Sequence, residues 1–411
     1  MLMDSLQLDS PPTPWSSANL AKLISQDYSS RPSSREAAMQ GPISQRLIGH
    51  RIKAARVAAE RTQEDLTRAL GLNDRQSVSD IENGKRALKP DEWVTLSGYL
   101  GLDLESFLDP LTVAGEAQFS WRAHPSIPQS TLDAFERVAS RWVGVLRWLR
   151  TRGERSPASA LKPTLRLSAR SSFEDAQDCA EALARELGLG RVPTDDLIDR
   201  IERRLDIPVL YVDAPTTDGA SISGAACHLD DLAVLLINRH ESVARRHFDL
   251  AHELFHALSW DALRPAPRES TAIDGVRPVK RVEQLADNFA AALLMPRASL
   301  DTLIDRSRVT DLDHLRDAAE VLRVAPVSLA WRLFNLRLID EPTRQQLARE
   351  RQRPVADDVP PRFSRAFVEM LHEALDRGEI SARKAAGSMG LDLDGLRTLF
   401  AEHGRPAPFD L

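Results

Sequence analysis

The sequence predicts a multidomain fold: an all-α N-terminal domain, then an α+β domain with a short sheet, then an α-helical C-terminal extension. Three observations support this prediction. Helical periodicity interrupted by glycine and proline covers residues 43–110, short β-rich apolar runs occupy residues 208–238, and helical periodicity returns from residue 241. A chain of 411 residues is long enough for two or three domains of ordinary size.

The composition is that of a globular chain. Hydrophobic residues make up 42% of it, which is enough to bury real cores, and no apolar run is long enough to span a membrane. The first residues lack the basic and apolar regions of a signal peptide. Cys179 and Cys227 lie far apart and form neither a metal-ligand pattern nor a disulfide framework, which suits a reducing compartment. We therefore expect a cytoplasmic protein with no membrane partner.

The expected domain boundaries follow the changes in pattern along the chain. Nine Ser and five Pro in the first 42 residues are typical of a disordered tail. Between the all-α and α+β domains we expect an irregular segment and one long helix, which together form a helical linker. The predicted units are the tail 1–42, the all-α domain 43–110, the linker 111–165, the α+β domain 166–340 and the extension 341–411.

The all-α domain contains a helix-turn-helix pattern, in the segment TQEDLTRALGLNDRQSVSDIENG that begins at Thr62. Thr62 is in position to cap the first helix, with Asp65 at the capping-box position. Asp74 is in position to cap the second helix, in which Val78 and Ile81 face inward. The opposite face of the second helix is then free for a partner.

That outward face suits DNA. It carries Arg75, Gln76, Ser79 and Asp80, and Arg and Gln at the start of a recognition helix can reach base edges in the major groove. Residues 46–89 hold ten Lys and Arg against six Asp and Glu, whereas the whole chain has a formal net charge of -6. A basic segment in an acidic protein indicates a nucleic-acid surface, although an ordinary solvated helix surface explains the charge equally well.

Residues 45–110 resemble the lambda-repressor-like (XRE) helix-turn-helix family. The matching motifs are Thr62-Gln63, Leu66, Gly71, Val78-Ser79 and Ile81-Glu82-Asn83-Gly84-Lys85. The resemblance implies a homodimer on double-stranded operator DNA, with Gln63 and Lys85 on phosphates. It implies base contacts by Arg75, Gln76 and Ser79. The alternative is a helix-turn-helix that serves dimerisation or protein contact.

The α+β domain is predicted from a change of periodicity. The runs Pro208–Val212, Ile222–His228 and Leu232–Asn238 are short, apolar and β-rich. Helical patterns follow at Glu241–Ser259 and Val282–Leu294. We therefore expect a short sheet packed beside the first of these helices.

That helix carries an HExxH motif. Four residues separate His252 from His256, so both lie on one helix face and can share one metal ion. Zinc is usually four-coordinate and needs a third protein ligand and a water. Zinc lowers the pKa of its water from near 16 to roughly 7, and Glu253 can take a proton from that water and return it to a leaving amine. The motif occurs by chance in roughly one or two such chains per hundred.

The third ligand is expected on the next helix. His256 is followed by Ala-Leu-Ser-Trp, so the metzincin extension is absent. The downstream helix bears Glu283 and, one turn later on the same face, Asp287. This is the gluzincin arrangement, in which the second acid accepts a hydrogen bond from a ligating His. His240 and His247 are expected to be surface or capping residues. Tyr211 and His228 are candidates for stabilising an oxyanion, although packed strand positions explain them more simply.

Residues 170–340 resemble the ImmA/IrrE metallopeptidase family. The matching motifs are Ile222-Ser-Gly224, Ile237-Asn238, the run Arg246-His-Phe-Asp-Leu-Ala-His-Glu-Leu-Phe-His256 and Glu283-x-x-Ala-Asp-x-Phe-Ala290-x-x-Leu-Leu-Met-Pro296. The resemblance implies a zincin-like fold with Zn²⁺ on His252, His256 and Glu283 and with Glu253 as the catalytic base. It also implies a protein substrate such as a repressor or regulator.

These patterns together predict a DNA-binding transcriptional regulator with a zinc-dependent endopeptidase domain that cuts a regulatory protein. One alternative is a repressor whose peptidase-like domain is a non-catalytic sensor or partner-binding module. Another is a toxin–antitoxin or phage-related regulator whose partner is a toxin. The intact Glu253 favours the enzyme, because a sensor could keep the metal without the base.

Overall fold

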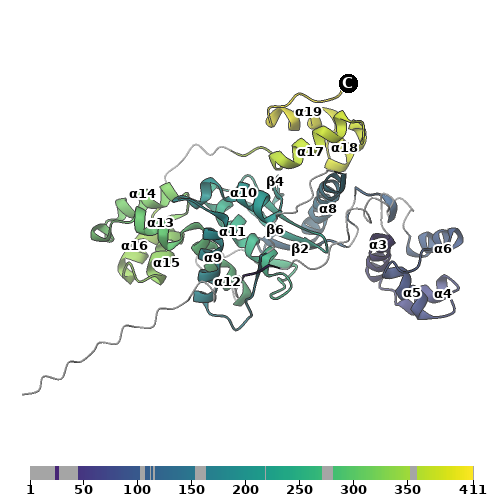
Figure 1. Ribbon diagram of the computed structural model, residues 1–411, viewed down its shortest axis with the longest axis horizontal. Coiled ribbons are helices and arrows are strands. Elements are labelled where there is room, and N and C mark those ends of the chain that lie inside the picture. Colours follow the sequence, from purple (N-terminus) through teal and green to yellow (C-terminus); the bar gives the residue numbers. More distant parts are fainter. Residues whose placement is uncertain are drawn as a thin grey trace, which may run out of the picture.

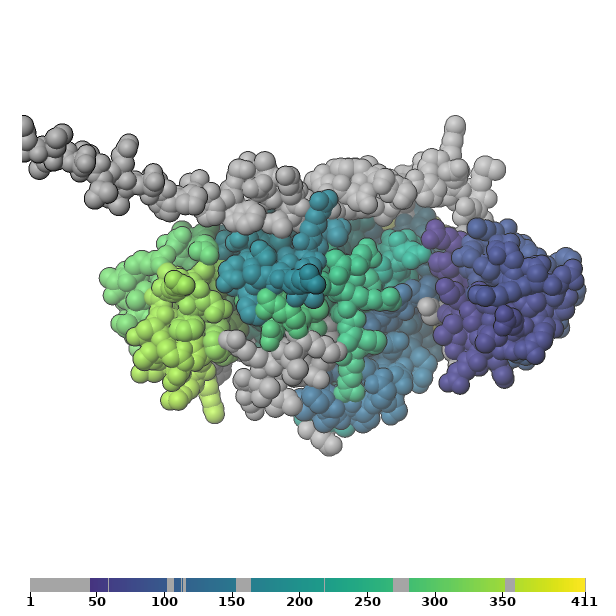
Figure 2. Space-filling model, turned by 90° about the horizontal axis from the view of Figure 1, so that it is seen from below, coloured from purple at the N-terminus to yellow at the C-terminus, as the bar shows by residue number. Residues whose placement is uncertain are grey.

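A computed structural model gives the structure of the chain. It describes residues 24–26, 45–101, 107–111, 113, 116–152, 163–217, 219–270, 281–351 and 359–410. An N-terminal helical domain lies at one end of the molecule (Figures 1 and 2). A sheet with helices on both faces forms the centre (Figure 1). The predicted order, an all-α domain followed by an α+β domain and C-terminal helices, is confirmed. None of the described helices combines the length and the apolar character of a bilayer-spanning segment.

The N-terminal domain consists of α3 (Gln45–Ala58), α4 (Gln63–Ala69), α5 (Arg75–Glu82) and α6 (Pro90–Leu100). All four helices enclose one small apolar core. Its fully or nearly fully buried side chains include Ile52, Leu66, Val78, Ile81 and Leu96. The inward positions expected of the helix-turn-helix pattern are therefore the ones that the fold buries.

Local hydrogen bonds begin both helices of the helix-turn-helix. The Thr62 hydroxyl accepts from the Asp65 amide at 3.1 Å, and the Asp65 carboxylate accepts from the Thr62 amide at 2.9 Å. The Asp74 carboxylate accepts from the Ser77 amide at 2.8 Å and so caps α5. These bonds satisfy amides that would otherwise lack partners, which is why the sequence alone located both helix starts.

The central sheet has the strand order β4 (Val209–Val212), β7 (Leu232–Asn238), β6 (Ala220–Leu229), β2 (Gln118–Ala123) and β8 (Arg268–Ser270), with β5 (Thr216–Thr217) paired to β6. The pairs β4–β7 and β2–β8 are parallel, and the others are antiparallel. Strand β2 was not predicted, since residues 111–129 were expected to be irregular. It comes from the segment expected to be a linker, yet it lies inside the sheet.

Helices cover both faces of the sheet (Figure 1). One face packs on α9 (Phe173–Leu187), α11 (Val243–Ser259) and α12 (Arg281–Leu294). The other packs on α8 (Gln129–Arg152), α17 (Arg365–Asp376), α18 (Ala382–Met389) and α19 (Leu393–Glu402). Along β7, Leu235 and Ile237 enter the first core, while Val234 and Leu236 enter the second. Burial on both faces is the reason that β7 reads as an unbroken apolar run.

The remaining elements extend this centre. They are β1 (Ile24–Gln26) paired with β3 (Pro163–Leu165), the short turns η1 (Pro193–Asp195), α10 (Leu197–Arg200), η2 (Ile201–Leu205) and η3 (Arg306–Arg308), and the helices α13 (Arg297–Leu303), α14 (Leu312–Leu322), α15 (Pro326–Asn335) and α16 (Glu341–Arg349). Helix α16 is the first helix of the segment 341–411, which was expected to be a helical extension. Apart from β1, the predicted disordered tail lies outside the described residues.

Candidate metal centre and DNA-binding surface

The predicted metal ligands converge where α11 packs beside α12. The Nε2 atom of His252 lies 3.0 Å from Nε2 of His256 and 3.4 Å from Oε2 of Glu283. The Nε2 atom of His256 lies 3.8 Å from the same Glu283 oxygen. All three residues are buried, and their donor atoms lie within 4.8 Å of one another.

The spacing of these donors fits a zinc ion. Two ligands about 2.1 Å from a tetrahedral zinc are separated by about 3.4 Å. The observed separations of 3.0, 3.4 and 3.8 Å fall on both sides of that value. Two imidazoles and one carboxylate are also the ligand types that catalytic zinc sites use. His252, His256 and Glu283 would therefore hold the metal.

The charges around the donors also fit a divalent cation. Four carboxylates meet at this point of α11 and α12, and two guanidinium groups contact them. With neutral imidazoles the cluster carries an excess of two negative charges, which is costly in a buried place unless a cation balances it. The groups are Asp249, Glu253, Glu283 and Asp287 against Arg122 and Arg245.

Asp287 lies behind the His252 ring. Its Oδ1 atom is 2.9 Å from Nδ1 of His252. Burial by itself raises the pKa of Asp287, but the hydrogen bond from His252 and the charge of Arg122 outweigh burial and leave the pKa below its usual value. An ionised Asp287 accepts a hydrogen bond from the Nδ1–H group of His252, so the Nε2 lone pair of that ring points toward the other two ligands.

Glu253 is fully buried on α11, next to His252. Strand β6 passes close to it at Gly224. A Cβ atom on Gly224 would lie 2.7 Å from the Leu236 carbonyl oxygen and 3.6 Å from Cγ of Glu253. A larger residue would displace the β7 backbone, so the glycine lets β6 pass directly over the Glu253 side chain.

Three charged residues of the site were missed by the sequence analysis. The Nε atom of Arg122 lies 3.3 Å from Asp249, and its Nη1 atom lies 3.7 Å from Asp287. Arg245 donates to the other Asp249 oxygen at 2.9 Å. Helical spacing could have indicated Arg245 and Asp249, since they lie seven and three residues before His252 on α11. Nothing in the sequence pattern indicated Arg122.

The two other histidines near the motif have structural partners. The exposed His240 ring contacts Asp213 at 2.7 Å. The buried His247 ring contacts the Arg323 carbonyl at 3.3 Å, at the C-terminal end of α14. These positions agree with the surface and capping roles that the sequence suggested.

The structure does not favour the two oxyanion candidates. Tyr211 lies on β4, which β7 separates from β6, and burial raises its pKa to about 12. His228 stacks on Trp260 at the end of α11, with ring centroids 5.1 Å apart. It lies four residues along β6 from Gly224, about 13 Å away.

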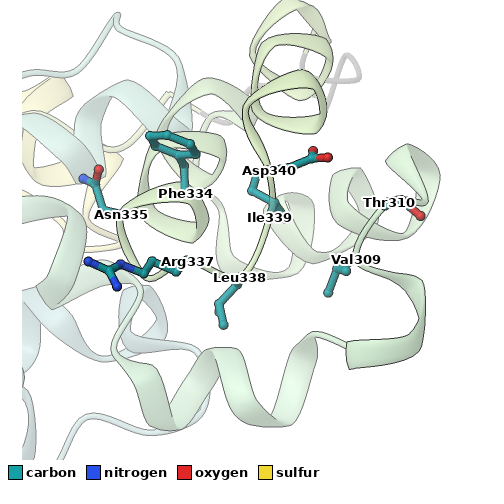
Figure 3. A pocket seen from close by; sticks show the side chains of 8 residues that line it. All are labelled: Val309, Thr310, Phe334, Asn335, Arg337, Leu338, Ile339 and Asp340. Atoms are coloured by element: carbon teal, nitrogen blue, oxygen red, sulfur yellow. The ribbon is translucent and has the colours of Figure 1, made fainter.

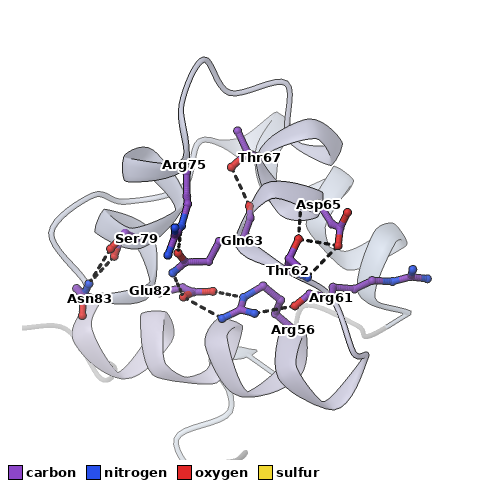
Figure 4. A network of polar contacts seen from close by, with 10 residues as sticks. All are labelled: Arg56, Arg61, Thr62, Gln63, Asp65, Thr67, Arg75, Ser79, Glu82 and Asn83. Atoms are coloured by element: carbon purple, nitrogen blue, oxygen red, sulfur yellow. Dashed lines mark hydrogen bonds and ion pairs between the residues drawn. The ribbon is translucent and has the colours of Figure 1, made fainter.

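The predicted DNA-contacting residues lie on or beside α4 and α5 (Figure 4). Arg75, Gln76 and Lys85 are exposed, and Ser79 and Gln63 are half-buried. The Gln63 amide donates to the buried Glu82 carboxylate at 2.8 Å, and Arg75 donates to the Gln63 oxygen at 2.8 Å. Glu82 thus holds Gln63, and Gln63 orients Arg75 at the start of α5.

Two further contacts shape the outward face of α5. The Gln76 amide donates to Asp80 at 2.9 Å, and the Asn83 amide donates to the Ser79 carbonyl at 2.7 Å. The Nε atom of Arg56, on α3, lies 2.5 Å from Oε1 of Glu82 and balances the charge of that carboxylate. The outward face of α5 therefore presents Arg75, which Gln63 orients, and Gln76, which is bonded to the acid Asp80.

A surface pocket of about 660 Å³ lies away from the metal cluster, beside α15 and α16 (Figure 3). Its lining contains apolar and polar residues but none of the carboxylates or histidines of the metal cluster. The lining residues are Val309, Thr310, Phe334, Asn335, Arg337, Leu338, Ile339 and Asp340. The pocket therefore offers none of the groups that could hold a metal in the cluster.

Comparison with known proteins gives two family matches. Residues 202–334 match the IrrE N-terminal-like domain, and residues 52–107 match the helix-turn-helix family. Both fall where the sequence indicated them. The search of curated proteins gives no match.

Two solved structures are similar, both of the competence regulator ComR in its apo form. The one from Streptococcus vestibularis is 12% identical, with 74% of this chain and 89% of that chain covered and a TM-score of 0.15. The one from S. thermophilus is 11% identical, with 87% and 94% covered and a TM-score of 0.15. Such low TM-scores do not establish a shared fold.

Proposed function

Because this chain joins a helix-turn-helix domain to an IrrE N-terminal-like domain, we propose that it is a DNA-binding transcriptional regulator whose second domain is a zinc-dependent endopeptidase. The observation that carries the proposal is the convergence of His252, His256 and Glu283 beside Glu253. Three protein ligands leave a fourth position open, and zinc bound there supplies a water of lowered pKa. The proposed substrate is a regulatory protein, such as a repressor or toxin.

The protein side chains divide the work of peptide hydrolysis. Glu253 takes the proton of the attacking water and passes it to the leaving amine. Its complete burial strengthens each electrostatic interaction that it makes. Asp287 fixes the tautomer and orientation of His252. A non-catalytic sensor would need the same ligands but not Glu253, so that residue distinguishes the two functions.

The N-terminal half is proposed to bind double-stranded operator DNA as a homodimer. The exposed start of α5, with Arg75 held by Gln63, supports this proposal. Half-sites about one helical turn apart would match a dimer of such domains. Cleavage of a partner protein would then change transcription at that operator.

The test replaces the base and leaves the ligands intact. Glu253→Gln should bind about one zinc per chain, as the wild type does, while His252→Ala should lose zinc and Glu283→Ala should bind it weakly. Labelling of protein N-termini in cells expressing each protein should reveal new termini with the wild type alone. Equal cleavage by both proteins would exclude Glu253 as the base, and cleavage by neither would favour the sensor. A wild type that stays metal-free after zinc loading would refute the site.

A further inference from the structure

Strand β2 brings a residue from outside the peptidase-like half into the metal centre. Arg122 lies 130 residues before His252 in the sequence. It pairs in register with Gly224 of β6, the residue that lies against Glu253. Its side chain is 5% exposed and therefore belongs to the interior of the site. The metal ligands, in contrast, all come from α11 and α12.

The Arg122 guanidinium lies between two carboxylates of those two helices. It contacts Asp249 of α11 at 3.3 Å and Asp287 of α12 at 3.7 Å. The Asp287 oxygen that it contacts is also the one that accepts from Nδ1 of His252 at 2.9 Å. A single side chain therefore connects β2, α11 and α12 directly behind a metal ligand.

We propose that Arg122 is a positioning residue of the metal centre, which holds Asp287 and through it presents the His252 ring to the metal. The inference rests on the proposed function in that it presumes a metal on His252, His256 and Glu283. Arg122 acts through Asp287 and need not touch the metal or the substrate. The strand that follows the helix-turn-helix domain thereby completes the site.

The chemistry of the guanidinium explains why arginine is needed here. Its planar fork can face two carboxylates at once, whereas a lysine ammonium is a compact point charge on a flexible stem. Arg245 also contacts Asp249, so Asp249 keeps one partner if Arg122 is lost. Asp287 would lose the guanidinium that contacts it and keep its hydrogen bond with His252. We therefore expect the effect of a substitution to appear at Asp287 and His252.

The experiment compares Arg122→Met, Arg122→Lys and Arg268→Met in the full chain. Arg268 is the matched control, because it lies on neighbouring β8 and donates to the carbonyls of His124, Pro125 and Ile127. Zinc affinity is measured by competition with a chelator, and Co²⁺ is loaded as a spectroscopic probe of ligand geometry. Loss of such an outer partner typically weakens metal binding by about 10–100-fold. We expect this loss and an altered Co²⁺ spectrum for Arg122→Met, partial recovery for Arg122→Lys and no change for Arg268→Met.

A double variant tests whether Arg122 acts through Asp287. Asp287→Asn should weaken zinc binding, and adding Arg122→Met should weaken it little further, because the two residues work as one unit. The proposal would be overturned if Arg122→Met kept the wild-type zinc affinity and Co²⁺ spectrum. It would also be overturned if the fold-losses of zinc affinity in the two single variants multiplied in the double variant. If Arg122→Met does not fold, the same comparison is made with Arg122→Lys. If the wild type binds zinc and Arg122→Met binds it with the same affinity, this inference alone is refuted. If the wild type binds no zinc, the proposed function is refuted as well.

Discussion

His247 illustrates how a single residue connects α11, the helix of the HExxH motif, to its surroundings. It lies on α11, five residues before His252, and its ring contacts the Arg323 carbonyl of α14. Burial lowers the pKa of His247 to about 4, even though the bonded carbonyl acts in the opposite direction. The ring is therefore neutral in the folded protein at ordinary pH.

This pKa predicts a pH dependence of folding. The folded pKa of about 4 is below the unfolded value of 6.5, so the unfolded chain binds more protons between these two values. The stabilising contribution is complete above pH 6.5 and falls as pH decreases toward 4, by about 2 kcal/mol at pH 5. Urea unfolding of metal-free protein at several pH values should show this slope in the wild type and a shallower one in His247→Gln. Identical slopes would contradict the prediction.

Helix α5 is the element on which the proposed DNA recognition depends. Its exposed first residue, Arg75, is oriented by Gln63, while Lys85 is exposed just after the helix. Arg75→Ala should cost roughly 1–3 kcal/mol at the cognate site and relax base preference there. Lys85→Ala should weaken binding to all sequences alike and reduce the salt slope by about one.

A binding titration on the promoter DNA of this protein, at several salt concentrations, separates these two effects. Base readout depends on sequence, whereas phosphate contact depends on salt. If neither substitution changes affinity or salt slope, α5 does not read DNA, and a protein-contact role becomes the better account. Neither measurement depends on the peptidase-like domain.

On the scale of the whole molecule, the C-terminal helices are part of the central fold. Phe367 of α17 is completely buried, and its ring contacts Phe363, which in turn contacts Trp142 of α8. The Trp142 indole also donates to the Met389 carbonyl at 3.0 Å. These contacts pack the C-terminal helices and α8 over the sheet face opposite α11 and α12.

Phe367→Ala should therefore destabilise the central domain. Deleting a buried aromatic ring typically costs about 3–5 kcal/mol, because a cavity remains. The urea midpoint of the tryptophan signal should fall accordingly. Val359→Ala is the control, since Val359 is 41% exposed and should change stability by less than about 0.5 kcal/mol. Equal midpoints for Phe367→Ala and the wild type would show that the C-terminal helices fold apart from the sheet.

The helix-turn-helix domain is also joined to the centre by polar contacts. Arg51 of α3 donates to the Phe107 and Asp109 carbonyls at 2.9 Å and pairs with Glu116 at 3.2 Å. Glu116 lies two residues before β2, whose Arg122 reaches the metal centre. The short segment 116–122 thus contacts the helix-turn-helix domain through Glu116 and contacts Asp249 and Asp287 through Arg122.

Local patterns in the sequence determined most of the elements and brought out the proposed metal ligands. The Thr62–Asp65 capping box, the four-residue spacing of His252 and His256 and the Glu283–Asp287 turn each involve residues a few positions apart. Helical and strand periodicity express such relations directly, which is why β7 and α12 were predicted within a residue of their observed bounds.

The tertiary structure decided what depends on residues far apart in the chain. Only the sheet register places Arg122 opposite Gly224 and so beside Asp287, because strand pairing and not sequence spacing brings them together. The six residues of β2, QFSWRA, alternate polar and apolar, but this local pattern does not say which strands β2 joins. The second face of the sheet is covered by α8, which lies well before β7 in the chain, and by α17 to α19, which lie more than a hundred residues after it. Such contacts depend on how the whole chain buries its apolar surface, and a pattern of a few neighbouring residues does not contain that information.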